Sequence, residues 1–245
     1  MKNTKRPSRG DKATQGPLTR AAKASQWEES YGIHKITLTA AQKEFQNKIL
    51  QNDMVICESP AGTGKSMTAL YTFVKEYLRD TTKQIMVVRT PVEAGADKIG
   101  ALPDNLNAKI EPHFASAKAL LEMLLNKGKV ETDMDHRIHF KIPNFCLGAT
   151  FDNTLLVIDE VQQLPPLILK LMLERVGHNS KVVVLGDSSQ LYTSAHGRNA
   201  LRDCIPRFFD SSMQPKYPDI SYHRFTIEDI QRSDFVKTVV RAYSD

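Results

Sequence analysis

Residues 58–66 read Glu58-Ser59-Pro60-Ala61-Gly62-Thr63-Gly64-Lys65-Ser66 and stand between an apolar run at 54–57 and a run with helical spacing at 66–78. A strand, a glycine-containing loop, Gly-Lys-Ser and a helix in this order are the parts of a phosphate-binding loop. In such a loop glycines let backbone N–H groups turn toward one point, and the helix N-terminus adds positive partial charge. Lys65 would reach the outer phosphates of a nucleotide, and the Ser66 hydroxyl would bind Mg²⁺. The stretch therefore predicts a nucleotide site.

One position of this stretch departs from the usual pattern. The pattern begins with glycine, and here Ser59 stands at that place, while Gly62 and Gly64 remain to supply the unusual backbone angles. A chance Gly-Lys-Ser in a surface turn is the competing interpretation. The strand-like and helical flanks favour the phosphate-binding loop, because the motif requires that context.

Length and composition fit a globular α/β protein. The chain has 245 residues, of which 41% are hydrophobic and 25% are charged, so it allows one large domain or two small ones. No stretch approaches the run of about 18 apolar residues that spans a membrane, and the N-terminus lacks the apolar core of a signal peptide. We therefore expect no membrane contact. The chain has only three cysteines, far apart at Cys57, Cys146 and Cys204, so we expect no disulfide framework and a cytoplasmic location.

The positive charge is concentrated at the N-terminus. Residues 1–25 contain seven lysines and arginines against Asp11 alone, a net charge of +6, which leaves −1 of the total of +5 for the rest of the chain. Few large apolar residues accompany this charge, so we expect a disordered basic tail over residues 1–26 and a single domain over residues 27–245. The tail is either a non-specific contact for nucleic acid or a plain solvated arm, and both interpretations remain open.

Thr39 and Gln42 precede a short amphipathic helix at 43–50 and allow two interpretations. Threonine followed three residues later by glutamine is a capping box, in which each side chain bonds the backbone N–H of the other residue. A glutamine amide can also donate and accept hydrogen bonds together, as recognition of the adenine edge requires. The residues alone leave both roles of Gln42 open.

Polar side chains follow two further apolar runs that we expect to be buried parallel strands. The run at 155–158 ends in Asp159 and Glu160, and ligands of open α/β sheets bind at this edge. Asp159 is placed to hold Mg²⁺ and Glu160 to orient or deprotonate an attacking water, unless this is a chance acidic strand end. The run at 182–185 ends in Gly186-Asp187-Ser188-Ser189-Gln190, where Gln190 either contacts a γ-phosphate or the attacking water, or belongs only to a turn.

The spacing of apolar residues and the positions of prolines and glycines predict the remaining elements. The two histidines within 136–140 have no third ligand nearby, so we predict no metal there. The expected elements are a buried strand at 84–88, a helix at 105–126 broken at Pro112, a strand of hairpin type at 136–140, a helix at 167–176, a strand at 220–225 and a closing helix at 235–243.

Four elements with polar residues stand in a fixed order: residues 59–66, residues 89–95, Asp159-Glu160 with Gln162, and residues 186–190. This order resembles the first motor domain of superfamily 1 helicases and, more closely, the PhoH-like family of P-loop ATPases. The resemblance spans roughly residues 39–243. The matching segments are Pro60-Ala61-Gly62-Thr63-Gly64-Lys65-Ser66, Val92-Glu93-Ala94-Gly95, Ile99-Gly100 with Leu102-Pro103, Asp159-Glu160-x-Gln162 and Asp229-Ile230-x-Arg232-Ser233.

The resemblance implies a RecA-like α/β fold, in which helices cover both faces of a mostly parallel central sheet, and hydrolysis of ATP with Mg²⁺. It places Ser66 and Asp159 at the metal. The residues to which it gives catalytic roles are Lys65, Glu160, Gln190 as γ-phosphate sensor and Arg232 as arginine finger. The residues that it places around ATP are Gln42 at the adenine and Pro60, Ala61, Gly62, Thr63, Gly64, Lys65, Ser66 and Met67.

Two features depart from the family. Ser59 replaces the opening glycine, and Leu147-Gly148-Ala149-Thr150 stands where the family usually has Arg-Gly-Arg-Thr. If the two arginines serve nucleic acid or a neighbouring subunit in relatives, that contact is weakened or moved in this chain.

The size of the chain bears on its assembly and its function. It has room for one motor domain, whereas a helicase normally completes its site with a second. We therefore expect a homo-oligomeric ring, a hexamer as the family suggests, with Arg232 acting in its own chain or in a neighbouring one. Two other functions remain open: a helicase-like motor stimulated by single-stranded RNA or DNA, and a nucleotide-dependent scaffold or switch with little turnover.

Overall fold

The computed structural model describes residues 33–90, 106–190 and 199–243, and residues 106–110 by their backbone alone. The expected basic tail at 1–26 and the family segments at 92–95 and 99–103 lie outside these residues.

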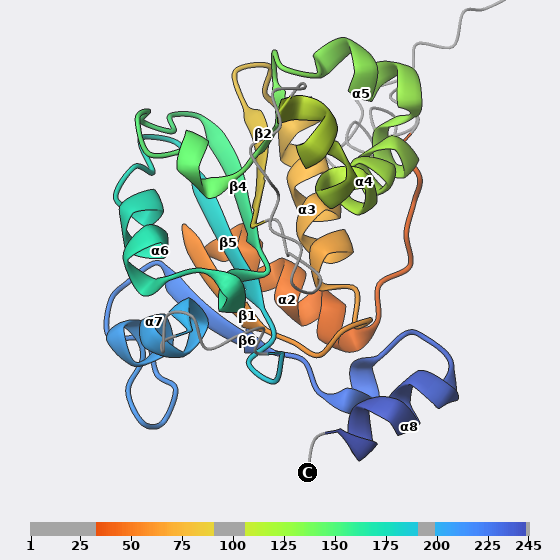
Figure 1. Cartoon of the computed structure of the whole chain (residues 1–245), viewed down its shortest axis with the longest axis vertical. Coiled ribbons are helices and arrows are strands. Elements are labelled where there is room, and N and C mark those ends of the chain that lie inside the picture. The colour runs from red at the N-terminus through yellow and green to blue at the C-terminus, as the bar shows by residue number, and fades with distance from the viewer. Residues whose placement is uncertain (1–32, 91–105, 191–198, 244–245) are drawn as a thin grey trace, which may run out of the picture.

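Six strands of the described chain form one parallel sheet in the spatial order β3-β2-β4-β5-β1-β6 (Figure 1). The apolar runs of the sequence become the four inner strands β2, β4, β5 and β1, because parallel strands covered on both faces are apolar throughout. The strands are β1 Met54–Glu58, β2 Gln84–Arg89, β3 Ile138–Lys141, β4 Thr154–Asp159, β5 Lys181–Gly186 and β6 Ile220–Arg224.

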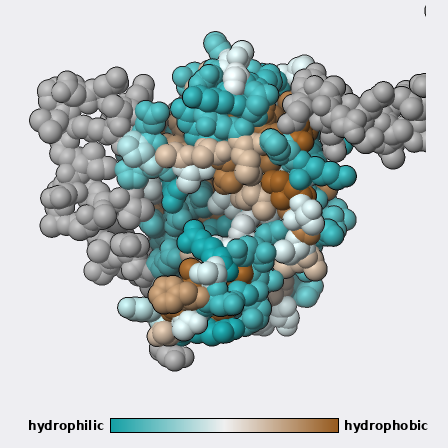
Figure 2. Space-filling view, turned by 90° about the vertical axis from the view of Figure 1, so that its right-hand side faces the viewer, coloured by the Kyte–Doolittle hydropathy of each residue, from teal (hydrophilic) through white to brown (hydrophobic). Residues whose placement is uncertain are grey.

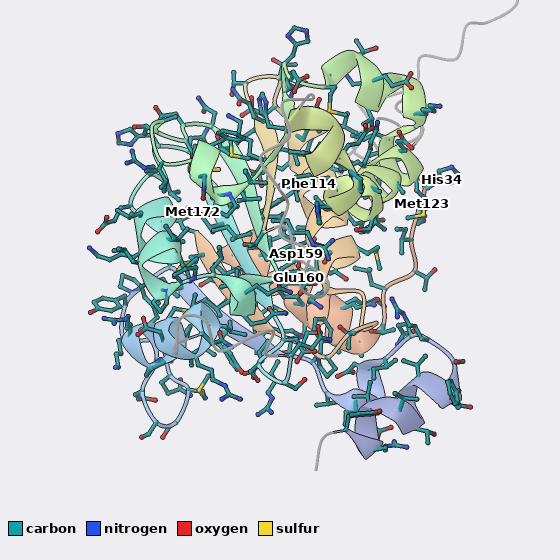
Figure 3. The ribbon with its side chains drawn as sticks, in the orientation of Figure 1. His34, Phe114, Met123, Asp159, Glu160 and Met172 are labelled. Carbon is teal, nitrogen blue, oxygen red and sulfur yellow. The ribbon has the colours of Figure 1, made fainter. Side chains whose placement is uncertain are left out.

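Helices cover both faces of this sheet. Alternate residues of each strand pack into separate cores: Val55 belongs to the core under α2, α3, α4 and α5, and Ile56 to the core under α6 and α7. Phe114 and Met172 mark these two helical layers in Figure 3. The expected α/β fold with helices on both faces is confirmed. The helices are α2 Ala40–Gln51, α3 Lys65–Arg79, α4 Leu106–Leu125, α5 Lys127–Asp133, α6 Pro166–Leu173 and α7 Ala200–Phe208, with short 3-10 turns η1 Pro143–Phe145 and η2 Val161–Gln163.

The last helix, α8 Asp234–Ala242, stands apart from both layers (Figure 1). It follows the 3-10 turn η4 Ile227–Asp229 and packs mainly on that turn. None of its residues is buried. Across the described residues, none of the helices combines the length and the apolar character that crossing a bilayer requires.

The expected hairpin at 136–140 is wrong. The strand there, β3, pairs in parallel with β2, because the chain first crosses one face of the sheet through α4 and α5. The alternation that suggested a hairpin belongs to a half-exposed strand at the edge of the sheet.

Two helix boundaries also differ from expectation. α4 runs through Pro112 without a break, since Phe114 and Leu121 bury its following turns against the sheet and offset the lost hydrogen bond. The helix expected to reach residue 176 ends at Leu173, because Val176 instead pairs with Phe151 in a parallel bridge.

Candidate nucleotide site

The loop between β1 and α3 has the backbone form that the sequence predicts. Gly62 and Gly64 have φ angles of 86° and 84°, in the left-handed region that residues with a Cβ rarely adopt. A Cβ on Gly64 would also lie 2.6 Å from Gln42 Nε2, which is closer than such atoms approach. Gly64 directly precedes Lys65, the first residue of α3, so the loop leads into a helix N-terminus whose free N–H groups attract anions.

Ser59 fits the place that usually holds glycine. It is fully buried, and its φ is not among the positive values that would require glycine. Its backbone N–H donates to Gly186 O at 2.9 Å, which fixes the start of the loop to the end of β5. Its hydroxyl donates to Pro60 O at 2.9 Å and shares a hydrogen bond with the Thr63 hydroxyl. The serine therefore braces the loop from within instead of distorting it.

Gln42 forms the capping box that the sequence allows. Its Oε1 accepts from Thr39 N at 3.1 Å, and its backbone N–H donates to Thr39 Oγ1 at 3.2 Å. Its Nε2 also donates to Thr63 O at 2.9 Å, and the side chain is buried. Gln42 thus connects the start of α2 to the phosphate-binding loop, which neither sequence interpretation includes.

The predicted metal ligands lie together at the carboxyl edge of the sheet. The Ser66 hydroxyl in the first turn of α3 donates to Asp159 Oδ2 at 3.2 Å, where β4 ends. Figure 3 shows Asp159 next to Glu160 beside α3. Hydroxyl and carboxylate oxygens are the ligand types that Mg²⁺ takes in proteins, so the two side chains fit the predicted role.

Glu160 has an unusual backbone conformation at this edge. Its φ and ψ are 56° and 40°, in the left-handed region, and its N–H donates to Asp159 Oδ1 at 3.0 Å. A residue with a Cβ takes this conformation at a cost of about 1–3 kcal/mol, and such residues concentrate at functional sites. The turn directs the chain sharply from β4 into η2.

Two side chains hold the Glu160 carboxylate. Arg89 Nη2 lies 3.4 Å from Glu160 Oε1, and Gln162 Nε2 donates to Oε2 at 2.7 Å. Arg89 ends β2, in register with Asp159, and its Nη1 donates to Ser116 Oγ of α4 at 3.1 Å. Sequence reasoning places Arg89 only at the head of a family segment and misses this contact. The position of Arg89 at the end of an apolar strand is the sequence feature from which a place at this site could have been predicted.

Gln162 continues this network to the next strand. Its Oε1 accepts from Asp187 N at 3.1 Å, just after β5. The ends of β2, β4 and β5 are therefore linked through Arg89, Glu160 and Gln162.

Comparison with known families identifies the chain. The family model described as PhoH-like protein matches residues 35–244. The chain belongs to the PhoH-like family. The expected family is thereby confirmed.

Curated PhoH-like relatives agree with this assignment. The PhoH-like protein of Synechocystis sp. is 27% identical over 206 residues, which are 84% of this chain and 61% of the relative. That of Bacillus subtilis is 32% identical over 154 residues, 62% of this chain and 48% of the relative. Protein PhoH of Escherichia coli K12 is 26% identical over 207 residues, 83% of this chain and 56% of the relative. The chain spans about half to three fifths of the length of these relatives.

Solved structures with a similar fold include two phage large terminases. That of bacteriophage HK97 gives a TM-score of 0.51 at 15% identity, over 93% of this chain and 48% of the terminase. That of a thermophilic bacteriophage gives 0.50 at 12% identity, over 84% of this chain and 50% of the terminase. At such identities the likeness concerns the fold alone, and it agrees with the expected RecA-like architecture.

Arg232, the expected arginine finger of this PhoH-like chain, lies beside its own phosphate-binding loop. A Cβ on Gly62 would be 3.0 Å from Arg232 Cδ, and the neighbouring Gln231 N–H donates to Gly62 O at 2.9 Å. In the described part of the chain Arg232 has no ion-pair partner. Arg232 is an exposed residue, and its side chain lies against the loop at Gly62.

Gln190 and Met67, two other residues that the family suggests, also lie near this loop or its strand edge. Gln190 closes a turn after β5, where its N–H donates to Asp187 O at 3.2 Å and its side chain is half-buried. Met67 lies beside Gly64, at 3.5 Å from a Cβ built there. The structure has a turn at 186–190, and the contact of Gln190 with a γ-phosphate or the attacking water stays a prediction.

Glu58, which sequence reasoning also misses, supports the other flank of the loop. Its carboxylate accepts hydrogen bonds from the hydroxyl of Ser188 and, at 2.5 Å, from that of Tyr222 in β6. Burial and the bond to Glu58 raise the pKa of Tyr222 above its usual value, so this phenol remains a donor. β1, β5 and β6 are thereby joined where they meet the nucleotide loop.

Proposed function

We propose that this PhoH-like chain is a Mg²⁺-dependent ATPase that hydrolyses ATP to ADP and phosphate. The observation that carries the proposal is the juxtaposition of Ser66, Asp159 and Glu160 at the mouth of the phosphate-binding loop. A bare phosphate-binding loop allows many reactions, whereas a carboxylate next to the metal-ligand pair adds a group that can activate water.

Each residue has a role in the proposed reaction. Loop N–H groups and Lys65 hold the phosphates, and Ser66 and Asp159 would hold Mg²⁺, which neutralises charge on the transferred phosphoryl group. Glu160 orients the attacking water and accepts its proton, and Gln190 contacts the γ-phosphate or the same water. Positioning and charge stabilisation supply most of the catalysis in such reactions.

Arg232 is the proposed arginine finger within its own chain. The support is its place against Gly62. An arginine finger accelerates this class of hydrolysis by about 10³–10⁵. Gln42 is the proposed contact of the adenine edge, since one N–H of its amide has no partner in the described structure.

The wider assignments are proposals of the same kind. We place the protein in the cytoplasm as a homo-oligomer, a hexamer favoured by the family, acting on or near single-stranded RNA or DNA. The basic N-terminal segment supports a nucleic-acid contact. The missing Arg-Gly-Arg-Thr stretch counts against a contact through residues 147–150.

Substitution of the site residues tests the proposed activity. Lys65→Ala and Glu160→Gln should each reduce ATP turnover to background, because they remove a phosphate contact and the group that activates water. Chelation of divalent ions should do the same. Phosphate release by purified protein is the measurement, with the exposed Lys43→Ala and Glu131→Gln as matched controls. Full activity of Glu160→Gln would refute the assignment.

The same assay separates the two competing functions. A turnover that rises several-fold with single-stranded RNA or DNA favours the helicase-like motor. A wild-type rate no faster than that of Glu160→Gln, with nucleotide binding intact, favours a scaffold or switch.

A further inference from the structure

α8 carries an apolar stripe that nothing in the described chain covers. Phe235, Val239 and Tyr243 follow one another at intervals of four residues and so lie along one face. Their exposed fractions are 74%, 38% and 88%. Figure 2 looks onto the side that carries α8 and shows hydrophobic residues at the surface of its lower part. A contiguous row of this kind marks an interaction surface, whereas single exposed apolar residues are ordinary.

A groove of about 800 Å³ lies elsewhere on the same chain. It runs between α6, α7 and the amino ends of β1, β5 and β6. Leu167 on its rim is 61% exposed. Apolar side chains that line the groove include Leu167, Leu173, Val176, Phe208 and Ile220.

The stripe and the groove lie on opposite sides of the molecule. α6 and α7 cover one face of the sheet, and α8 projects from the far side (Figure 1). α8 is also tied to the carboxyl edge, since Gln231 N donates to Gly62 O at 2.9 Å, whereas the groove opens at the amino edge. The α8 of one chain therefore does not reach its own groove, and a second copy is the occupant that carries the matching surface.

Charge and size fit this pairing. The groove is rimmed by four carboxylates, Asp53, Glu174, Asp203 and Asp219, against Lys170 and Arg207, a net charge of −2. α8 has Lys237 and Arg241 against Asp234, a net charge of +1, and Arg241 also pairs with Glu228 of η4 at 2.5 Å, which among the described residues leaves Lys237 as the unneutralised cation of the helix. Each aromatic residue buries about 150–250 Å², so the stripe with its groove would bury on the order of 1,000 Å² in total, the lower limit of a specific interface.

We propose that α8 of one copy docks into the α6–α7 groove of a second copy. Because the two surfaces differ, the interface is heterologous, and its repetition joins copies head to tail into a ring or a filament. This interface names the surfaces of the homo-oligomer proposed above and so rests on that part of the proposed function, but it does not depend on ATP hydrolysis.

Single substitutions on each surface test the interface in the full chain. Phe235→Glu alters α8 and Leu167→Glu alters the groove, both at exposed positions where folding tolerates a charge. The matched control is Phe145→Glu, which changes an aromatic residue that is 54% exposed and lies on neither surface. Sedimentation should show wild type and control associating beyond the 27.6 kDa monomer, and each interface variant associating at least about tenfold more weakly. Circular dichroism verifies that each variant is folded.

Mixing the two interface variants gives the decisive result. Phe235→Glu keeps an intact groove and Leu167→Glu keeps an intact α8, so the mixture should pair through one interface and stop at twice 27.6 kDa. A folded mixture that stays monomeric overturns the proposal, because the intact α8 of Leu167→Glu would then not bind the intact groove of Phe235→Glu. A wild type that is monomeric at its highest soluble concentration also overturns it. Loss of ATP turnover in any variant leaves the result unchanged, because mass is the readout.

Discussion

Glu160 keeps a left-handed backbone and has a donor on each carboxylate oxygen, Arg89 on one and Gln162 on the other. The strain of that backbone costs about 1–3 kcal/mol, so surrounding contacts must hold the turn. Arg89 reaches Ser116 of α4 with its second nitrogen, which a flat guanidinium fork allows. We infer that Arg89 is a positioning residue that orients the carboxylate for the attacking water.

Arg89→Ala should lower kcat for ATP hydrolysis by about ten- to hundredfold, because a small misplacement of a catalytic group has this effect. KM should change by less than about twofold, since the hydrogen bonds and the ion pair of Arg89 among the described residues go to His113, Ser116 and Glu160 and not to the loop that binds phosphate. Arg89→Lys should recover part of the loss, because it restores the charge and not the fork. Steady-state kinetics measure both constants, with Ser116→Ala as the milder control. A raised KM at unchanged kcat would instead make Arg89 a nucleotide contact.

Much of the site could be predicted residue by residue, because its members lie in short local patterns. Gly64 and Ser66 follow one apolar strand and Asp159 ends another, so strand-end position alone brings them to one edge. The role of Ser59 could not be predicted, since it depends on a backbone angle and on the Thr63 hydroxyl. The contact of Arg89 joins residues 71 positions apart, and only the register of β2 beside β4 places it.

At the scale of elements, β6 is attached to α2 through His223. This side chain is 3% exposed, and its ring lies 5.1 Å from that of Phe45 and 4.5 Å from that of Phe225. Burial, and secondarily Lys48, lower the pKa of His223 to about 4, although Glu44 and Asp229 act in the opposite sense. Its Nε2 has no hydrogen-bond partner in the described structure. The packing therefore requires a neutral ring.

Acid should weaken this attachment. In the unfolded chain His223 binds a proton near pH 6.5, and in the folded chain only near a pKa of about 4. The unfolded state therefore binds more protons between these values, so stability falls as pH drops from about 6.5 to about 4, by at most about 3 kcal/mol. His223→Phe should flatten the change in urea unfolding between pH 7 and pH 5, and the exposed His178→Phe should not. Equal slopes for wild type and His223→Phe would exclude this origin.

Elements that are buried on both faces were predictable, and edge elements were less so. β1, β2, β4 and β5 appear in the sequence as uninterrupted apolar runs, because each contacts helices on both sides. β3 is half-exposed, and its alternating pattern is shared by hairpins and by edge strands of parallel sheets. The continuation of α4 through Pro112 depends on the packing of its later turns, which the presence of a proline in the sequence does not predict.

At the scale of the whole molecule, the sheet order decides what lies together. Strands distant in sequence, such as β1 and β5, become neighbours, and α8 and the α6–α7 groove come to opposite sides. Apolar spacing predicts α2, α3, α4, α6 and α8, misses α5 and α7, and carries no information on which surfaces lie on opposite sides of the molecule. The distribution of charge along the chain, in contrast, follows directly from the sequence, since residues 1–25 have a net charge of +6 and the rest of the chain has −1.

This division of charge predicts how the molecule contacts nucleic acid. Deletion of residues 1–26 should abolish most binding to single-stranded RNA or DNA, because seven basic side chains leave and the remainder repels phosphate weakly. The logarithm of the binding constant of the full chain should fall linearly with the logarithm of salt concentration, at about 0.7 per phosphate neutralised, and the deletion should flatten this line. ATP turnover without nucleic acid should remain within about twofold, because the proposed nucleotide site lies outside residues 1–26.

Fluorescence anisotropy across salt concentrations measures the slope, with the seven basic residues changed to glutamine as a control of equal length. Unchanged affinity and slope after deletion would move the contact to the folded body, and absence of binding by the full chain would leave the segment a solvated arm.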